Sequence, residues 1–322
     1  MKVLVTGADG FAGSWLVKRL LSAQHEVFGT TVGAGAPAAP LLTAAERAAV
    51  GWRRLELTDE ASVRSGLLPP AGGTWDAIVH LAAIAWSRDA ADDPDRARDV
   101  NVGGVVRVVR CAGELRREGR SDPLLLLVST GEVYGRDRDG APHTELDPPQ
   151  PVSPYSIGKL DAEREGERAA SAAGLRLIIA RPFPHTGPGQ RPVFVVPALL
   201  ARLRAAKAAG AKEIPTGDLA PVRDFLDVRD VASAYLALLE RGRPGEIYNV
   251  ASGTGRRLQD IFGRLAALVD ADITARPEAA LKRPWDLPHL VGDATKLRAA
   301  TGWAPRYSLE QTLMDLVNAE TH

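Results

Sequence analysis

The chain has 322 residues, of which 45% are hydrophobic and 25% are charged. These values are typical of a globular protein with room for one large domain or two modest ones. Lys and Arg together number 40, as do Asp and Glu, so the formal net charge is zero, which excludes general binding to a nucleic-acid backbone.

The cysteine content and the N-terminal sequence indicate the cellular setting. The single Cys111 excludes an internal disulfide framework and fits a reducing cytosol, and its apolar neighbours indicate a small core residue on a helix. Met1–Thr6 is a short apolar stretch unlike a signal peptide, and the longest aliphatic run, Leu124–Val128, is too short to span a bilayer. We therefore expect a soluble, cytoplasmic protein without a membrane partner.

The first half of the chain alternates predicted strands with predicted helices. Lys2–Thr6 is short, apolar and followed by Gly7, which is the pattern of a buried parallel strand. Further strands are predicted at Glu26–Thr31, Arg53–Leu57, Asp76–Leu81, Leu124–Ser129 and Leu175–Ala180, and the helices include Phe11–Leu21, Asp95–Arg117 and Pro154–Ala173. This alternation predicts an α/β fold with a Rossmann-type, doubly wound parallel sheet, forming a dinucleotide-binding domain over residues 1–180.

The second half of the chain changes character after Arg181-Pro182-Phe183. Short strands are predicted at Glu213–Thr216, Glu246–Val250 and Asp272–Ala275, between helices at Val193–Ala209, Val228–Glu240, Leu258–Val269 and Leu309–Ala319. We expect residues 181–322 to form mainly a smaller α/β substrate lobe over the carboxyl ends of the strands, with residues 225–252 returning to the first domain.

A glycine loop follows the first predicted strand and opens the first predicted helix. Its first glycine, Gly7, permits a tight turn, Gly10 lets the backbone approach a pyrophosphate, and Gly13 allows close packing of helix on strand. The backbone N–H groups near Phe11 and Ala12 then face the phosphates at the positive end of the helix. The loop predicts a dinucleotide cofactor.

The segment expected to hold the adenosine ribose does not distinguish NAD from NADP. A carboxylate at the end of the second strand would repel a 2′-phosphate, and an arginine there would attract it. Residues Phe28–Gly33 include neither, so both cofactors remain open. After the third strand, Glu56 is placed to accept a hydrogen bond from the adenine amino group.

The pentad from Tyr155 to Lys159 carries the catalytic prediction. Ser153 and Pro154 are typical of a helix start, as the N-cap and the first helical residue, so Tyr155 and Lys159 lie one turn apart on one face. A free phenol titrates near pH ~10, and the ammonium and the positive helix end are expected to favour the phenolate. Lys159 is also placed to hold the cofactor ribose, and Thr130 to hydrogen-bond the substrate oxygen that Tyr155 protonates. Together they predict hydride chemistry on an alcohol or a ketone.

Motifs along nearly the whole chain resemble those of one family. They are the glycine loop, His80-Leu81-Ala82-Ala83, Asn101-Val102, Ser129-Thr130-Gly131-Glu132-Val133-Tyr134-Gly135, Tyr155-x-x-x-Lys159 and Arg223-Asp224-Phe225-Leu226-Asp227-Val228. With them the chain resembles the extended short-chain dehydrogenase/reductase family, in its NAD-dependent epimerase/dehydratase group, which acts on nucleotide sugars. The resemblance implies that NAD(P)H contacts the glycine loop and Thr30, Glu56, Leu57, Leu81, Ala82, Ala83, Tyr155, Lys159 and Pro182.

The same resemblance implies the residues that act on the substrate. The catalytic set is Thr130, Tyr155, Lys159 and Glu132. The substrate contacts implied are Thr130, Glu132, Phe183, His185, Val195, Arg223, Arg283 and Asp286. Arg223 and Arg283 are expected near the phosphates of a nucleotide sugar, because a guanidinium grips phosphate through two parallel hydrogen bonds. No metal site is expected.

Three stretches of the second half are most similar, within the family, to GDP-4-dehydro-6-deoxy-D-mannose reductases. They are Ala180–Gln190, Arg223–Val231 and the tail from Arg283 to Trp303. The similarity implies NAD(P)H-dependent reduction of a GDP-linked 4-keto-6-deoxy sugar to GDP-D-rhamnose. One departure is Pro184, which replaces an asparagine that touches the substrate and has no N–H of its own. Either His185 or a water compensates, or the sugar sits differently.

Other functions are compatible with parts of the same pattern. A 4,6-dehydratase would use Glu132 as the base that removes the C5 proton, although such enzymes often carry Asp or Ser where this chain has Gly131. A 4-epimerase would retain NAD and recycle it. A cofactor-sensing regulator without catalysis is disfavoured by the intact Thr130, Tyr155 and Lys159.

The resemblance also implies a homodimer. Two subunits would pair through a four-helix bundle built from the predicted helices Asp95–Arg117 and Pro154–Ala173. The first of these helices has an apolar stripe wider than one contact with a sheet needs, formed by Val102, Val105, Val106 and Val109.

Overall fold

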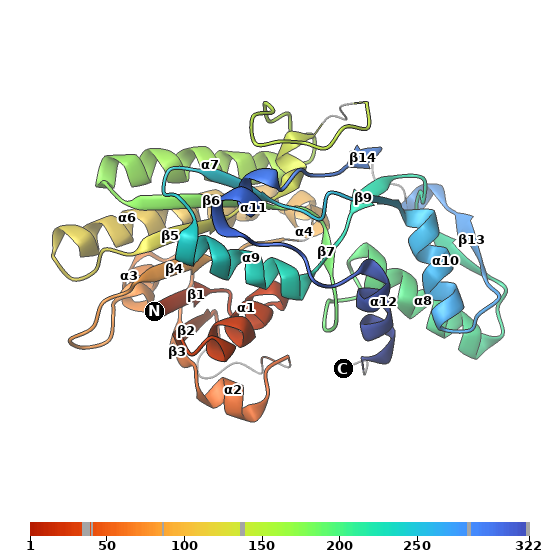
Figure 1. Cartoon of the computed structure of the whole chain (residues 1–322), viewed down its shortest axis with the longest axis horizontal. Helices are drawn as coiled ribbons and strands as arrows, with labels where there is room; N and C mark the ends of the chain where they lie inside the picture. Colours follow the sequence, from red (N-terminus) through yellow and green to blue (C-terminus); the bar gives the residue numbers. More distant parts are fainter. Residues whose placement is uncertain (34–38, 40, 86, 136–138, 282–284, 320–322) are drawn as a thin grey trace.

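A computed structural model of the chain describes residues 1–33, 39, 41–85, 87–135, 139–281 and 285–319. Their centre is a seven-stranded parallel sheet in the order β11-β6-β5-β4-β1-β2-β3 (Figure 1). The strands are β1 (Lys2–Thr6), β2 (Glu26–Thr31), β3 (Gly51–Arg54), β4 (Ala77–His80), β5 (Leu124–Val128), β6 (Arg176–Pro182) and β11 (Ile247–Val250). The strand order turns back between β1 and β4, and ligands of such folds bind beside that point at the carboxyl ends of the strands. The predicted fold class is confirmed.

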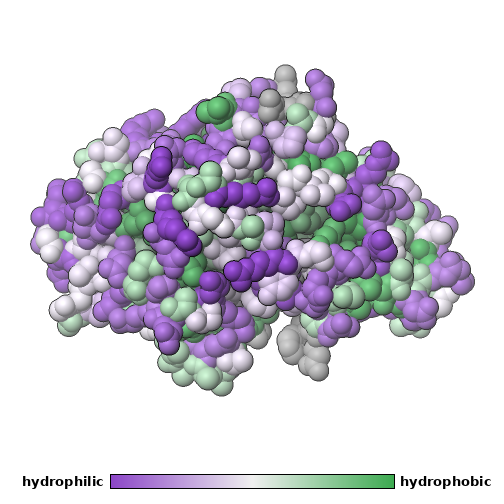
Figure 2. Space-filling model, viewed as in Figure 1, coloured by the Kyte–Doolittle hydropathy of each residue, from purple (hydrophilic) through white to green (hydrophobic). Residues whose placement is uncertain are grey.

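Hydrophilic residues cover most of the face seen in Figure 2, with hydrophobic residues between them in smaller groups. Such a mixture is ordinary for a folded chain, whose surface always retains apolar atoms. In the part of the chain that the structure describes, no helix is both long enough and apolar enough to cross a bilayer.

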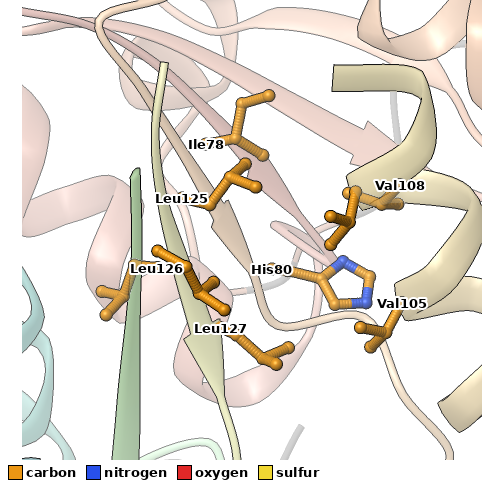
Figure 3. A pocket seen from close by; sticks show the side chains of 9 residues that line it. Ile78, His80, Val105, Val108, Leu125, Leu126 and Leu127 are labelled. Atoms are coloured by element: carbon orange, nitrogen blue, oxygen red, sulfur yellow. The ribbon is translucent and has the colours of Figure 1, made fainter. Parts of the chain in front are cut away.

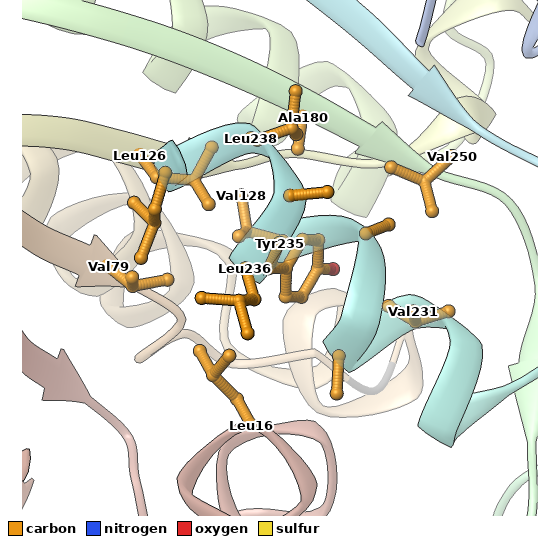
Figure 4. Packing of buried hydrophobic residues seen from close by; sticks show 14 of the residues in the cluster. Leu16, Val79, Leu126, Val128, Ala180, Val231, Tyr235, Leu236, Leu238 and Val250 are labelled. Carbon is orange, nitrogen blue, oxygen red and sulfur yellow. The ribbon is translucent and has the colours of Figure 1, made fainter. Parts of the chain in front are cut away.

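Helices cover both faces of the central sheet. One face carries α3 (Glu60–Leu67), α6 (Gly104–Arg117) and α7 (Pro154–Ala173), and here Val105 and Val108 of α6 pack toward Ile78 and Leu125 of the strands (Figure 3). The other face carries α1 (Phe11–Ser22) and α9 (Val228–Arg241), whose Tyr235 is buried among aliphatic side chains of the sheet and α1 (Figure 4). The central strands are therefore buried on both sides, which explains their continuous apolar sequences.

The second half of the chain adds a smaller group of elements, seen at the right of Figure 1. It contains α8 (Val195–Ala209), α10 (Leu258–Leu268), α12 (Leu309–Asn318), the paired strands β8 (Glu213–Thr216) and β13 (Thr274–Pro277), and a sheet of β12 (Gly255–Arg257), β9 (Val222–Asp224) and β14 (His289–Leu290). A separate core that includes Leu203, Leu265 and Leu313 holds its three helices together. The pair β7 (His185–Thr186) and β10 (Leu226–Asp227) lies where the chain leaves β6 and where it enters α9.

The structure differs most from the predicted elements at two places, and several other elements are shifted by one or two residues. The predicted strand Arg53–Leu57 is wrong in its second half, because Leu55 and Leu57 leave the strand and pack against Gly66 of α3 and Gly104 of α6. The predicted helix Asp95–Arg117 is divided into α5 (Pro94–Arg98), a π-helical turn (Asp99–Gly103) and α6. In that turn the Asn101 amide donates to the Ile84 carbonyl and accepts from its N–H, at 3.0 and 2.8 Å.

The remaining described elements are short. They are α2 (Ala44–Ala48), α4 (Ser87–Asp92), α11 (Thr295–Thr301) and 3₁₀ turns at Gly131–Tyr134 and Ala279–Leu281. Cys111 is a buried residue of α6, as predicted, and burial raises the pKa of its thiol to about 11. It is therefore a neutral core residue at physiological pH.

Candidate active site

The glycine loop forms a cradle that only glycines fit. Gly7 has a positive φ of 67°, and a Cβ there would lie 3.0 Å from the backbone of Ala82. A Cβ on Gly13 would lie 2.0 Å from the carbonyl oxygen of Gly7. Gly10 caps α1 without a side-chain hydrogen bond, so the first N–H groups of the helix stay available to an anion. These residues fit the pyrophosphate of a dinucleotide.

The end of β4 is held rigidly beside this cradle. The hydroxyl of Thr6 accepts hydrogen bonds from the N–H groups of Leu81 and Ala82, each at 3.2 Å, and therefore donates to Nδ1 of His80 at 2.9 Å. Burial lowers the pKa of His80 to about 3, so the ring is neutral. Its Nε2 has no hydrogen-bond partner among the described residues, and the ring lines a small cavity together with Val105 and Leu127 (Figure 3). Leu81, Ala82 and Ala83, predicted to contact the cofactor, are partly exposed here.

Of the residues predicted to contact the adenosine part of the cofactor, some are buried and one is accessible. Thr30 is 1% exposed and its hydroxyl accepts from the N–H of Gly7 at 3.4 Å, so its side chain supports the loop. Leu57 is also buried. Glu56 is partly exposed, and its carboxylate accepts from the N–H and hydroxyl of Thr58 at 3.3 and 3.0 Å.

One acid at the end of β2 was not foreseen from the sequence. Oδ2 of Asp9 accepts a hydrogen bond from the hydroxyl of Thr31 at 2.8 Å. Thr31 ends β2, so the loop places a carboxylate where the strand itself has none. The signal in the sequence was the acidic residue directly before Gly10.

Helix α7 positions the phenol and the ammonium. Ser153 is its N-cap, accepting from the N–H of Ser156 at 3.0 Å, and Pro154 is its first residue, as predicted. One turn after Tyr155, Lys159 is buried and donates through Nζ to the carbonyl of Val128 at 2.6 Å. That carbonyl belongs to the last residue of β5, and burial lowers the pKa of Lys159 to about 8.

The tyrosine is held in its protonated form. Burial, and then the negative charge of Glu132, raise the pKa of Tyr155 above its ordinary value of 10.0. The phenolate expected from Lys159 and the helix end is therefore not the favoured form in this structure, because burial and the charge of Glu132 raise the pKa of the phenol. A protonated phenol suits a proton donor rather than a base.

The turn after β5 brings Thr130 and Glu132 toward α7. Thr130 is buried and its hydroxyl accepts from the N–H of Glu132 at 3.2 Å, which caps the 3₁₀ turn packed against α7. Gly131, between them, lies under the ring of Phe183, where a Cβ would come within 2.9 Å of two ring atoms. Phe183 is 1% exposed, so its ring shapes this turn from the core.

The end of β6 and the turn that follows it carry further residues predicted to contact the cofactor or the substrate. Pro182 is the buried last residue of β6, and the His185 ring stacks on Phe11 of the glycine loop, with centroids 6.2 Å apart and planes at 5°. Nδ1 of His185 bonds to the carbonyl of Phe183 at 3.1 Å, and burial lowers the pKa of His185. The carbonyl of Pro184 accepts from the N–H of Leu226 at 2.9 Å. Val195 is the partly exposed first residue of α8.

Two predicted substrate residues pair with each other in the small lobe. The guanidinium of Arg223 donates to Oδ1 of Asp286, and also to the carbonyl of Val222 at 2.9 Å. Asp224 is turned away, accepting hydrogen bonds from the Ser252 and Gly253 segment and from Gly292. Arg283, predicted to bind phosphate, lies outside the described residues.

Comparisons with known proteins identify the family of the chain. The model of the NAD dependent epimerase/dehydratase family matches residues 3–251. The sequence is 33% identical to GDP-6-deoxy-D-mannose reductase from Pseudomonas aeruginosa, over 98% of this chain and 96% of that protein. RMD from Pseudomonas aeruginosa, solved with NADPH, is similar in structure with a TM-score of 0.79 and 29% identity over 98% of each chain.

A further similar structure has another named activity. UDP-glucose 4-epimerase from Thermus thermophilus, solved with NAD, has a TM-score of 0.84 and 27% identity over 99% of this chain and 98% of that chain. The family model and the reductase at 33% identity carry the assignment. The chain belongs to the NAD-dependent epimerase/dehydratase family, which confirms the resemblance and the predicted NAD(P) cofactor class.

Proposed function

We propose that this chain is an NAD(P)H-dependent reductase of a 4-keto-6-deoxy nucleotide sugar, converting GDP-4-dehydro-6-deoxy-D-mannose to GDP-D-rhamnose. The observation that carries the proposal is a tyrosine kept protonated beside Glu132, one helical turn from the Lys159 ammonium. The named activity of the 33% identical relative supports the substrate. In this proposal residues 1–180 and about 225–252 bind the cofactor, and residues 181–322 mainly bind the sugar nucleotide.

The residues divide the chemistry between them. The reduced nicotinamide supplies the hydride. Tyr155 donates its proton to the C4 oxygen as that oxygen gains charge, and the hydroxyl of Thr130 hydrogen-bonds the same oxygen and orients it. Lys159, fixed on the Val128 carbonyl, holds the ribose of the cofactor and stabilises the phenolate that remains.

The turn at Gly131 favours the reductase over a 4,6-dehydratase. A dehydratase must remove the C5 proton and also protonate the hydroxyl that leaves C6, so it needs an acid as well as a base. Glu132 could serve as the base. The Phe183 ring covers Gly131, so a second carboxylate next to Glu132 has no room.

We further propose that Arg223 and Arg283 bind the diphosphate of the sugar nucleotide. The Asp286 carboxylate and the Val222 carbonyl hold the guanidinium of Arg223 in one orientation. An oriented guanidinium gives two parallel hydrogen bonds to a phosphate, which a flexible lysine does not.

One incubation tests the proposed reaction. The protein is mixed with GDP-4-dehydro-6-deoxy-D-mannose and either NADH or NADPH, and the loss of reduced cofactor is followed together with the product. We expect one equivalent of cofactor consumed for each GDP-D-rhamnose formed. An epimerase or a dehydratase would instead return its cofactor at every turnover, leaving the absorbance unchanged while product appears.

The variant Glu132→Gln separates the reductase from the dehydratase. Tyr155 supplies the one proton that a ketone reduction needs, so most of the 4-keto reduction should survive this change. If the unaltered protein converts GDP-mannose to the 4-keto sugar without added reductant, and the Gln variant does not, the reductase assignment is wrong.

A further inference from the structure

The carboxylate at the end of β2 belongs to Asp9 of the glycine loop and not to a residue of the strand. Rossmann folds place an acid roughly 20 residues after the glycine loop, at the end of β2, where it accepts from the ribose 2′-hydroxyl of NAD. Here Thr31 occupies that place and its hydroxyl donates to Oδ2 of Asp9 at 2.8 Å. Among the described residues, Oδ1 of Asp9 has no hydrogen-bond partner, so it is available to a hydroxyl of the ribose.

We propose that Asp9 is the ribose-binding acid of this chain and that it selects NADH over NADPH. A carboxylate accepts from a 2′-hydroxyl but repels a 2′-phosphate, which carries about two negative charges near pH 7. The selection deepens the proposed function, since it names the cofactor. It depends on the cofactor class and is independent of which sugar is reduced.

Arg54 is the cation that opposes this selection. Its Cα lies opposite that of Thr31 in the parallel ladder of β2 and β3, so both side chains point to the face of the glycine loop. Arg54 is exposed, and its charge is therefore weakened by water and salt. Asp9 is partly buried and fixed by a hydrogen bond, so its charge acts at short range from a constant place.

Two further cations, on α1 and β3, are engaged elsewhere. Lys18 of α1 pairs with Glu46 at 2.9 Å. Arg53 points to the opposite face, over the ring of Phe28, and donates to the carbonyl of Leu68 at 2.5 Å. Neither is placed to offset the charge of Asp9 at the ribose.

The bond between Thr31 and Asp9 also has a purely structural role, as a tie between the loop and the sheet. Asp9→Asn separates the two roles, because an amide oxygen still accepts from Thr31 while the negative charge is gone. A structural tie alone predicts an unchanged preference between the cofactors. Charge selection predicts a changed one.

The test measures binding and needs no sugar substrate. Dissociation constants of NADH and NADPH are determined by cofactor fluorescence for the unaltered protein, Asp9→Asn, Thr31→Val, Arg54→Ala and the control Asp272→Asn. Asp272 is an exposed acid of the small lobe, so its variant makes the same charge change far from β2.

We expect the unaltered protein to bind NADH about tenfold more tightly than NADPH, because repulsion between one pair of charges near the surface changes a dissociation constant by about this factor. Asp9→Asn should remove most of this ratio, Thr31→Val should reduce it, and Asp272→Asn should keep it. Tighter binding of NADPH by the unaltered protein, or an unchanged ratio in Asp9→Asn, overturns the proposal. A ratio that depends on Arg54→Ala and not on Asp9→Asn also overturns it, in favour of Arg54.

The same measurements distinguish this proposal from the proposed function. If the ratio follows Asp9 but no 4-keto sugar is reduced, the cofactor selection stands and the reductase assignment fails. If the sugar is reduced with NADPH as readily as with NADH and the binding ratio is flat, the reductase stands and the selection by Asp9 fails.

Discussion

At the residue level, the chemistry of the site depends on the protonation states of Tyr155 and Lys159, which burial and the nearby Glu132 carboxylate control. Burial and then Glu132 raise the pKa of Tyr155 and keep it protonated, whereas burial lowers the pKa of Lys159 to about 8. The pair is thus arranged for a phenol that gives a proton, next to a cation whose charge is sensitive to pH.

Tyr155→Phe removes one hydroxyl and should leave the fold and the binding of cofactor nearly intact. Without the proton donor, turnover should fall by about 10²–10⁴-fold, the usual contribution of a general acid. The measurement is steady-state kcat for the sugar nucleotide, with cofactor affinity as the control for folding. Turnover within about threefold of the parent would rule out Tyr155 as the donor.

Lys159 should set the alkaline limit of activity. Burial lowers its pKa from 10.5 to about 8, so the ammonium is present below that pH and is lost above it. In the proposed function its charge holds the cofactor and the developing phenolate, so kcat/KM should decline as the pH rises through about 8. The pKa of Tyr155 is raised, so the phenol itself stays protonated in this range.

The variant Lys159→Arg provides the control for the pH profile. An arginine keeps its charge throughout this range, so the variant should be less active but should lose the decline near pH 8.

The lowered pKa of Lys159 also predicts how the stability of the fold depends on pH. Between about 8 and 10.5 the unfolded chain carries a proton on Lys159 that the folded chain does not. The contribution of Lys159 to the free energy of unfolding should therefore rise as the pH rises through this range.

At the level of elements, the start of α7 shows what could be predicted from the sequence. The N-cap, the proline and the spacing of Tyr155 and Lys159 are local features, and the structure has the predicted helix limits. The carboxylate of Asp9 at β2, the ring of Phe183 on Gly131 and the pair of Arg223 with Asp286 join distant segments. Packing of the whole chain brings these together, and periodicity and motif spacing do not show which distant segments meet.

Ser153→Ala should weaken α7 where the tyrosine is attached. The Ser153 hydroxyl accepts from the N–H of Ser156 at 3.0 Å and is buried, so its loss leaves that N–H without a partner. We expect the free energy of unfolding to fall by about 1–2 kcal/mol, measured by urea denaturation. Ser308→Ala removes an exposed cap from α12 and should cost about 0.5–1 kcal/mol. Equal losses in the two variants would show that burial of the first cap adds nothing.

At the level of the whole molecule, the apolar stripe on α6 has a different partner from the one foreseen. Val102, Val105 and Val109 are 7%, 2% and 3% exposed and belong to the core between α6 and the sheet of the same chain. These three residues of the predicted stripe are therefore used within the protomer, whereas the fourth, Val106, is only partly buried and lies outside that core. The apolar residues left on the outside of this region are Ile157 of α7, 46% exposed, and Val152 just before it, 42% exposed.

The homodimer expected from the family resemblance should therefore depend on Ile157. We predict a solution mass of about twice 34.3 kDa by sedimentation at micromolar concentration. Ile157→Asp places a charge on the outer face of α7, where pairing would bury it without a partner, so this variant should shift the mass toward the monomer. Leu146→Asp makes the same change on a loop where the side chain is 95% exposed, and it should leave the mass unchanged. A monomeric parent would contradict the dimer itself. A dimer that tolerates Ile157→Asp would instead place its interface away from α7, because a contact through this helix cannot bury an unpaired carboxylate without a large loss of affinity.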